Sequence, residues 1–350
     1  MDKEVKIGEK YIAGNNPCFV IAEAGVNHNG ELEKALELVS IAQNAGADAI
    51  KFQLFNTNEQ ISKHAKLAPY QQKSTGANTL AEMAKSYNLP WEKHKVIAEY
   101  CKKIGIMYIS SCFDFRAVDF LVNDLKGSCI KVGSGELTNY PLLRYISNTG
   151  KLILLSTGMS TLEDIRGAID QIRSNGTSPL VLLHCVSSYP TLEKEINLLA
   201  IKTIEREFKV PVGYSDHSEG NFASVAAVAL GAQVIEKHFT IDKSLPGPDH
   251  AMSLDPIGLN SFVKAIRMME EMLGDGIKNP TEAEKEMQVY ARRSVVAASN
   301  IKAGDKLGKN NVTLKRPATG IDPRSMKEII GKRVIVDIPL DKPITWDMLK

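Results

Sequence analysis

The sequence predicts an α/β protein, a (β/α)8 TIM barrel followed by a small domain with short β runs. Eight short apolar runs rich in β-branched residues recur along the chain, and helical stretches lie between them. The runs are too apolar to leave one face of a sheet in water, so we expect helices to cover the sheet. Eight such units over about 270 residues favour a closed barrel. A doubly wound open sheet is the alternative, but no GxGxxG follows the first run.

The predicted strands and helices alternate along the chain. Four helices are well marked, because each stretch carries apolar residues at helical spacing and ends in a glycine: 32–46, 91–105, 161–176 and 221–231. Thr161 is the expected N-cap of the third. The strands are expected at 19–25, 49–53, 107–111, 129–134, 152–157, 180–185, 212–217 and 234–239.

The chain divides in composition near residue 280. We expect a barrel domain over 1–272, a linker rich in glycine, proline and charge over 273–289, and a second domain over 290–350. The runs SVVAA and RVIVDI are its predicted strands. From residue 291 onward there are 13 Lys/Arg against 6 Asp/Glu, whereas the rest of the chain is mildly acidic. Because no aromatic interleaving accompanies this basic charge, nucleic-acid binding is not expected.

Composition indicates a soluble globular protein of the cytoplasm. The apolar fraction is 43% and the charged fraction 24%, which is ordinary for such proteins. No apolar run reaches the ~18 residues of a membrane span, and the first residues lack the apolar segment of a signal peptide. The 5 cysteines form no CxxC pair, which is typical of a protein in a reducing compartment.

Polar residues close almost every predicted strand, where TIM barrels carry their active sites. Burying an unpaired charge costs several kcal/mol, so Lys51, Lys131 and Glu136 indicate a ligand or a counter-charge. The other strand-end residues are Glu23, Asn27, His28, Gln53, Ser110, Ser111, Ser134, Ser156, Thr157, His184, Ser215, Asp216, His217, Glu236 and His238.

Two histidines end successive strands. Neighbouring parallel strands lie ~4.8 Å apart, so His217 and His238 can approach one ion. Imidazole suits Mn²⁺, Fe²⁺, Co²⁺ or Zn²⁺, and two histidines would leave positions open for a substrate carbonyl. A coincidence of two structural histidines is the alternative reading.

A second constellation is typical of an anion site. A lysine and three hydroxyls would lie together at the carboxyl end of the barrel and suit a phosphate or a carboxylate. They are Lys131, Ser134, Ser156 and Ser215. The glycines of KVGSGE (131–136) would let backbone N–H groups approach the anion closely. No GxxxxGK[ST] is present, which argues against a nucleotide P-loop.

The chain resembles the sialic acid synthase family, whose members condense phosphoenolpyruvate with an N-acetylated mannosamine-type sugar. The matching segments run in order along the chain, and as a set they are specific to the family. They are IAEAGVNHNG (21–30), GADAIKFQ (46–53), KVGSGE (131–136), LLSTGM (154–159), LHCVSSYPT (183–191), GYSDHS (213–218), IEKHFT (235–240), PGPDHAMSLDP (246–256) and KRPATGI (315–321). The resemblance implies a (β/α)8 barrel followed by an antifreeze-like SAF domain of the β-clip type.

The resemblance also implies a role for each site residue. Glu23 matches the catalytic acid/base, and Glu136 matches a carboxylate beside the metal. His217 and His238 match the ligands of a divalent cation, with Mn²⁺ the first choice and Mg²⁺ or Co²⁺ as alternatives. Lys131, Ser134, Ser156, Ser215 and Ser111 match the phosphoenolpyruvate site. The sugar site is matched by Lys51, Gln53, Tyr189, Asp249 and Arg316, the last reaching across a domain-swapped homodimer.

The chemistry follows as a hypothesis. The metal would make the open-chain sugar aldehyde electrophilic, carbon 3 of phosphoenolpyruvate would attack it, and water would add at carbon 2 before phosphate leaves with C–O cleavage. Pro246 and Pro248 would stiffen the loop that presents Asp249. The alternatives are a pyruvate-type metal-dependent aldolase using Lys131 or Lys51, and a spore-coat type family member that acts on a different sugar or only binds it.

The exact sugar is less constrained. The retained SGE and PGPDH patterns favour an N-acetylneuraminate or legionaminate product over a pseudaminate one. The stretch LAPYQQKSTGA (67–77) resembles a segment of the bacterial enzymes and favours an unphosphorylated sugar. Ser187 stands where some neuraminate synthases carry Asn, so one sugar contact would differ.

Overall fold

A computed structural model describes residues 4–14, 16–56, 60–62, 64–67, 72, 75 and 77–350. It divides into two compact units, Met1–Gly274 and Asp275–Lys350. All five cysteines are buried and free. Among the described residues, no helix combines the length and the apolar character needed to cross a membrane.

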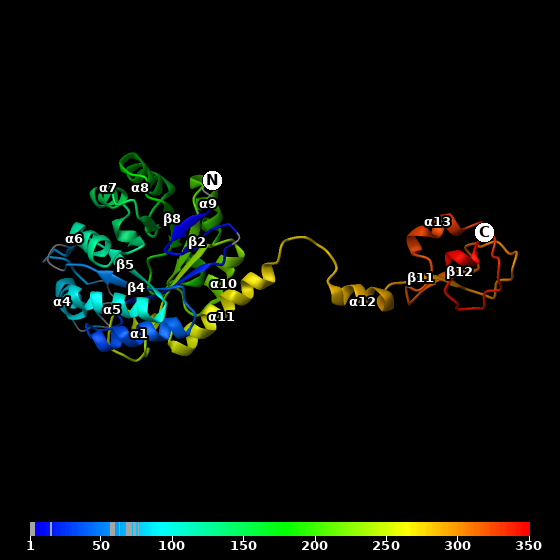
Figure 1. Cartoon of the computed structure of the whole chain (residues 1–350), viewed down its shortest axis with the longest axis horizontal. Coiled ribbons are helices and arrows are strands. Elements are labelled where there is room, and N and C mark those ends of the chain that lie inside the picture. The colour runs from blue at the N-terminus through cyan, green and yellow to red at the C-terminus, as the bar shows by residue number, and fades with distance from the viewer. Residues whose placement is uncertain are drawn as a thin grey trace. The chain divides into compact units, whose positions relative to one another are not determined.

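The first unit is a closed barrel of eight parallel strands, as predicted (Figure 1). The strands are β3 (Phe19–Gly25), β4 (Ala49–Leu54), β5 (Met107–Cys112), β6 (Cys129–Val132), β7 (Leu152–Ser156), β8 (Leu180–Cys185), β9 (Val212–Asp216) and β10 (Val234–His238). Each neighbours the next in sequence, and β10 pairs with β3 to close the ring. The observed bounds lie within two residues of those expected, which confirms the barrel over the open sheet.

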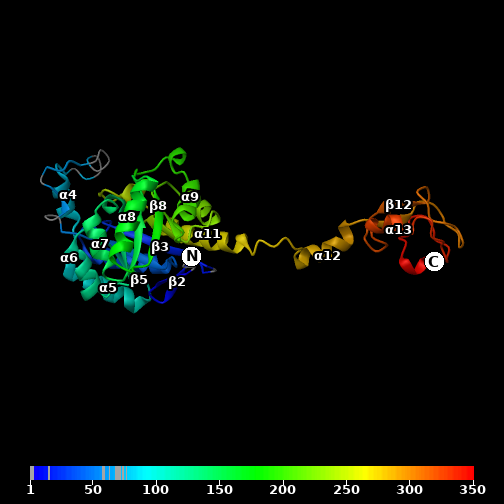
Figure 2. The same cartoon turned by 90° about the horizontal axis from the view of Figure 1, so that it is seen from above.

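Helices surround the barrel, as both views show (Figures 1 and 2). They are α1 (Leu32–Asn44), α4 (Leu80–Tyr87), α5 (Trp91–Ile104), α6 (Phe115–Asp119), α7 (Tyr140–Ser147), α8 (Leu162–Asn175), α9 (Leu199–Phe208), α10 (Phe222–Ala229) and α11 (Pro256–Leu273), with a π-helical turn at Phe120–Asp124. Thr161 caps α8 in a full capping box with Asp164, as the sequence indicates.

Strand alternation separates two cores. Side chains such as Phe19, Ile21 and Leu154 fill the barrel interior, and the hairpin of β1 (Val5–Ile7) and β2 (Lys10–Ile12) contributes Ile7 to this cluster. Residues of the opposite parity pack against the helices in a larger cluster. Because successive side chains of a strand point to opposite faces, each strand keeps its inward parity up to its carboxyl end.

The second unit contains a small apolar core of its own. It consists of α12 (Glu282–Ala291), β11 (Ser294–Ala297), β12 (Val312–Lys315), α13 (Met326–Ile329) and short 3₁₀ turns at Pro323–Ser325 and Trp346–Met348. SVVA forms β11 as predicted. The prediction of a strand at RVIVDI is wrong, because residues 333, 334 and 338 form only isolated bridges.

Part of the predicted linker is helical. Thr281 and Glu284 form a capping box that starts α12 at Glu282. The charged residues of this stretch, which suggest a linker, are also good helix formers. The helix buries none of its side chains within the chain.

Candidate active site

Each of the eight strands carries at least one inward polar side chain at the carboxyl end of the barrel, and β4 also carries Gln53. These side chains line an inner cavity of about 350 Å³. In strand order they are Glu23, Lys51, Ser111, Lys131, Ser156, Cys185, Ser215 and Glu236, and Ser134, His217 and His238 join them from just beyond the strand ends or on the last residue. The barrel thus brings together residues separated by more than 200 positions.

Lys51 lies between two carboxylates. Its Nζ is 3.2 Å from Glu23 Oε1 and 3.3 Å from Glu236 Oε2. It also donates a hydrogen bond of 3.2 Å to Ser111 Oγ. All of these side chains are buried, so water screens their charges little.

Lys131 lies near the other carboxylate oxygen of Glu236. Its Nζ donates to Ser156 Oγ at 2.8 Å and lies 3.7 Å from Glu236 Oε1. That same carboxylate oxygen accepts a hydrogen bond of 2.8 Å from Ser215 Oγ. The inner cavity therefore presents two ammonium groups and a row of hydroxyls.

The two carboxylates have opposite pKa shifts. Burial raises the pKa of Glu23 to about 7, and Lys51 only partly opposes burial. Burial acts in the same direction on Glu236, but Lys131 and Lys51 outweigh it and lower the pKa to about 2. Glu23 can therefore hold or release a proton near neutrality, whereas Glu236 stays ionised. Glu23 Oε2 has no hydrogen-bond partner among the described residues.

The KVGSGE loop leaves room for an anion. Apart from Gly135 and its two chain neighbours, no described residue has a heavy atom within 4 Å of where a Cβ on Gly135 would stand. Gly158 N–H donates to Ser134 Oγ at 3.0 Å, and a Cβ at Gly158 would stand only 2.7 Å from that oxygen. A side chain at position 158 would therefore displace Ser134 Oγ, and also Ser187 Oγ, which would lie 2.4 Å from the same Cβ.

His217 and His238 lie side by side, with ring centroids 5.6 Å apart. His217 Nδ1 donates to Val186 O at 2.9 Å, so its Nε2 keeps a free lone pair. His238 Nδ1 is buried without a hydrogen-bond partner among the described residues, and burial together with His217 lowers its pKa well below the usual value. Burial acts to lower the pKa of His217, but the hydrogen bonds to Cys185 and Val186 outweigh burial and raise it. Two imidazoles at this spacing fit a shared divalent cation once both are neutral, since metal–nitrogen distances are ~2.0–2.1 Å.

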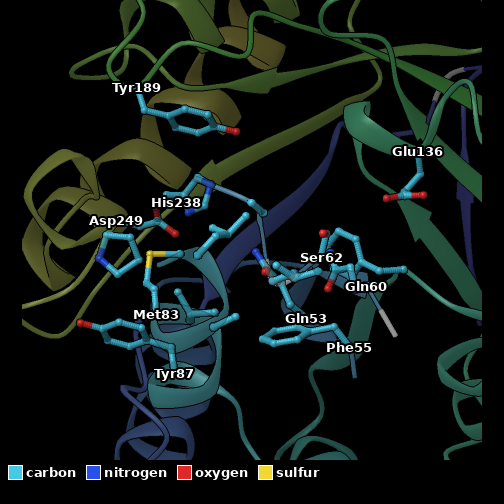
Figure 3. Close-up of a pocket in the computed structure, with 17 residues that line it drawn as sticks. Gln53, Phe55, Gln60, Ser62, Met83, Tyr87, Glu136, Tyr189, His238 and Asp249 are labelled. Atoms are coloured by element: carbon cyan, nitrogen blue, oxygen red, sulfur yellow. The ribbon is translucent and has the colours of Figure 1, made fainter. Parts of the chain in front are cut away.

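An outer cavity of about 410 Å³, whose lining is drawn in Figure 3, adjoins the inner one. The two cavities share Gln53, Phe113, Tyr189 and His238. Asp249 lies beside His238 in Figure 3, whereas Glu136 lies on the far side. One wall is largely apolar and consists of Val26, Phe55, Ile61, Leu80, Met83 and Ala84. No Lys or Arg of the described chain lines this cavity.

Asp249 is a buried carboxylate on the rim of the outer cavity. It is 8% exposed, and burial raises its pKa to about 6. Its carboxylate accepts no hydrogen bond from the described residues. It is therefore available to accept hydrogen bonds from a ligand.

All predicted catalytic, metal and substrate residues except Arg316 line at least one of the two cavities. Arg316 belongs to the second unit, directly after β12. Glu136 lines only the outer cavity, where Asn139 Nδ2 donates to its Oε2 at 2.7 Å. Ser187 lines the inner cavity. Most of the stretch 67–77 lies outside the described residues.

Sequence reasoning gave no role to Glu236 and Lys237. Glu236 has the same parity as Val234 and His238 and therefore points into the barrel. Lys237 points outward, where its Nζ is 2.9 Å from Asp216 Oδ2 in a buried pair. Because side chains alternate along a strand, the inward position of His238 predicts that Glu236 points inward and Lys237 outward.

A closed parallel barrel with a charged cavity at the carboxyl ends of its strands is a TIM-barrel architecture of the enzyme type. The model of the NeuB family matches residues 38–278, and that of the SAF domain matches residues 292–350. The chain belongs to the NeuB family, whose synthases are transferase-type enzymes.

Similar proteins cover nearly the whole chain. The N,N'-diacetyllegionaminic acid synthase of Legionella pneumophila is 41% identical over 338 residues, which is 95% of either chain. The Campylobacter jejuni enzyme of the same name is 44% identical over 317 residues, or 90% of this chain and 95% of its own. The crystal structure of the Leptospira borgpetersenii N-acetylneuraminic acid synthetase in complex with citrate is similar with a TM-score of 0.73 at 33% identity. It covers 81% of this chain and 94% of its own.

Proposed function

We propose that the protein condenses phosphoenolpyruvate with an unphosphorylated, N-acetylated mannosamine-type sugar and water. The products would be a nonulosonic acid and inorganic phosphate. The observation that carries this proposal is the row of Lys51, Glu236 and Lys131 beside paired histidines, next to a second cavity of sugar size. The relatives named as legionaminic and neuraminic acid synthases support it.

The inner cavity suits the donor. Phosphoenolpyruvate carries a carboxylate and a phosphate, and Lys131 and the serine hydroxyls would bind them through charge-assisted hydrogen bonds. Such preorganised donors act in a buried site without the cost of reorganising water. Glu236 stays ionised and favours the protonated form of both lysines; the pKa of Lys51 is raised, whereas burial still lowers that of Lys131.

The reaction balances as follows. Carbon 3 of the enol attacks the aldehyde carbon of the open-chain sugar, and water adds to carbon 2. The resulting tetrahedral centre expels phosphate as the C–O bond breaks. Glu23 is suited to transfer the protons, since its pKa lies near neutrality. A divalent cation held by His217 and His238 would polarise the aldehyde as a Lewis acid; we propose Mn²⁺, with Mg²⁺ or Co²⁺ able to replace it.

The outer cavity favours a deoxygenated diacetamido sugar. Its apolar wall would pack against a methyl group at carbon 6 and against acetamido methyl groups. A 6-phosphate dianion would meet Asp249, Glu136 and apolar side chains without a cation from the described lining, which is unfavourable. We therefore propose the legionaminate-type acceptor first and N-acetylmannosamine second. We further propose a domain-swapped homodimer in which the partner subunit's Arg316 completes the sugar site.

The decisive experiment measures phosphate release from phosphoenolpyruvate with each of four acceptors. These are N-acetylmannosamine, its 6-phosphate and the two diacetamido-trideoxy sugars that lead to legionaminate and pseudaminate. We expect release only with both substrates, fastest with the legionaminate precursor, lost with a chelator and restored by Mn²⁺. With ¹⁸O in the bridging oxygen of phosphoenolpyruvate, the label should appear in phosphate. Label retained in the sugar product would contradict C–O cleavage.

A pyruvate aldolase is the second candidate, because burial lowers the pKa of Lys131 and such a lysine can form a Schiff base. The two functions are separated by treating the protein with borohydride and pyruvate. The proposed synthase should not be trapped, whereas a mass increase on Lys131 or Lys51 would favour the aldolase.

A further inference from the structure

We propose that Asn29 and His250 are positioning residues that fix the loop 246–250, and with it Asp249, at the rim of the outer cavity. Neither residue lines either cavity. The role concerns acceptor binding, so its kinetic part rests on the proposed function.

One asparagine side chain holds both ends of this loop. Asn29 lies between β3 and α1, and its Nδ2 donates to Pro246 O at 3.0 Å. Its Oδ1 lies 3.0 Å from His250 Nε2. Both atoms of one amide group are thus used by a segment more than 200 residues away, which ties the last βα loop to the first.

The asparagine also sets the proton position on His250. Because Asn29 Nδ2 faces a carbonyl, its Oδ1 must face the imidazole, and His250 Nε2 must donate. His250 Nδ1 then accepts from Thr240 Oγ1 at 2.6 Å. This neutral tautomer agrees with burial, which lowers the pKa of His250 to about 4. Thr240, His250 and Asn29 therefore form one chain of hydrogen bonds.

The loop passes very close to this chain. A Cβ at Gly247 would stand 2.6 Å from His250 Cδ2 and 3.3 Å from Asn29 Oδ1. Real side chains do not approach so closely, so glycine is needed where the loop crosses the imidazole. Asn29 itself has φ 51°, a left-handed conformation that Asn adopts more readily than most residues.

Asp249 depends on this arrangement for its place. Burial and the charges of His217 and Lys51, but no hydrogen bond from a described residue, act on its carboxylate. Its backbone carbonyl accepts from Ser253 Oγ at 2.6 Å. Asn27 Nδ2 in turn donates to Ser253 Oγ at 3.0 Å. The first βα loop therefore contacts the chain both before and after Asp249, through Asn29 and Asn27. A binding group that is fixed in advance lowers the entropic cost of binding the acceptor.

The test replaces Asn29 by Gly, which tolerates the left-handed backbone, and by Asp, which keeps the acceptor for His250 but loses the donor to Pro246. We expect N29G to raise the acceptor KM about tenfold or more and to change the phosphoenolpyruvate KM by less than about twofold. N29D should fall between N29G and the wild type. Asn175→Ala, at an exposed asparagine that caps the end of α8, is the matched control and should change neither value.

Hydrogen–deuterium exchange supplies a readout that does not depend on activity. Amides of 246–253 should exchange faster in N29G than in the wild type, while those of β6 and β7 should not change. Unchanged exchange in 246–253, or equal rises in both KM values with a general loss of stability, would overturn the inference. A wild type that uses none of the four acceptors would contradict the proposed function instead, and the exchange result would still decide the positioning role.

Discussion

At the scale of single residues, two carboxylates in one cavity acquire opposite properties from their neighbours. Glu236 faces both lysines and accepts from Ser215, so its charge is compensated. Glu23 has the Lys51 ammonium as its only cation within 4 Å among the described residues and accepts a long hydrogen bond of 3.4 Å from Gln53 Nε2. Because burial penalises an uncompensated charge, the proton resides on Glu23 rather than on Glu236. This asymmetry assigns proton transfer to Glu23 and anchoring of the lysines to Glu236.

Replacing Glu23 by Gln tests this assignment. The amide has nearly the same shape and removes the titratable proton, so kcat for phosphate release should fall by about 10²- to 10⁴-fold. Binding of phosphoenolpyruvate, measured by calorimetry, should change much less. Glu33→Gln, at an exposed position on α1, is the control. An E23Q protein that keeps more than about a tenth of the wild-type kcat would rule out proton transfer by Glu23.

The residues that sequence reasoning could place are those marked by a strand end. Lys51, Lys131, His217 and His238 follow apolar runs, and period-2 alternation carries them into one cavity. Asn29 and His250 carry no such mark, because their contact forms only when the last βα loop folds back on the first. Glu236 is a different case, because period-2 alternation from His238 places it on the inner face, whereas the charges of Glu236 and Lys237 by themselves indicate no face.

At the scale of elements, α5 and the first βα loop bury histidines against the outside of the barrel. His94 on α5 is within 2.9 Å of Tyr108 OH on β5, and its ring packs edge-on against Phe52 of β4. Its Nε2 has no hydrogen-bond partner among the described residues. Burial lowers the pKa of His94 to about 3 and that of His28 to about 4. Both imidazoles are therefore neutral in the folded protein at pH 7.

These histidines should make the barrel sensitive to acid. The unfolded chain binds protons at a pKa near 6.5 and the fold does not, so the free energy of unfolding should fall as the pH drops below about 6.5. Each such group contributes up to about 1.4 kcal/mol per pH unit until its folded-state pKa is reached. Urea unfolding of metal-free protein between pH 7.5 and pH 5 measures the slope.

Replacing His94 by Gln isolates one group. The variant should be less stable at pH 7.5 because its packing differs, yet its pH slope should be smaller by about one proton. His64→Gln, at an exposed position, should keep the wild-type slope. An unchanged slope in H94Q would show that His94 does not supply the acid sensitivity.

At the scale of the whole molecule, the second unit has its own core around Val295, Ile301 and Ile338. Gly274 and Gly276 have positive φ and follow the end of α11. The charged residues after Thr281 form α12, which begins with a capping box, so a composition rich in glycine, proline and charge does not distinguish linker from helix there. A unit with a separate core can contribute residues to a site without taking part in the folding of the barrel.

The proposed domain swap makes a prediction about mixtures of inactive chains. His238→Ala should inactivate the barrel site that carries it, and Arg316→Ala should weaken any site to which that second unit contributes. If the partner subunit's Arg316 completes each site, a dimer formed from one chain of each variant contains one intact site. Random pairing during coexpression should then restore about one quarter of the wild-type activity. If Arg316 instead serves its own chain, every site in the mixed dimer carries a lesion and no activity returns. Two separately purified variants, mixed without exchange of subunits, are the control, because their pooled activity should remain at the level of the single variants. Activity in the coexpressed dimer alone would therefore identify the chain that supplies the arginine.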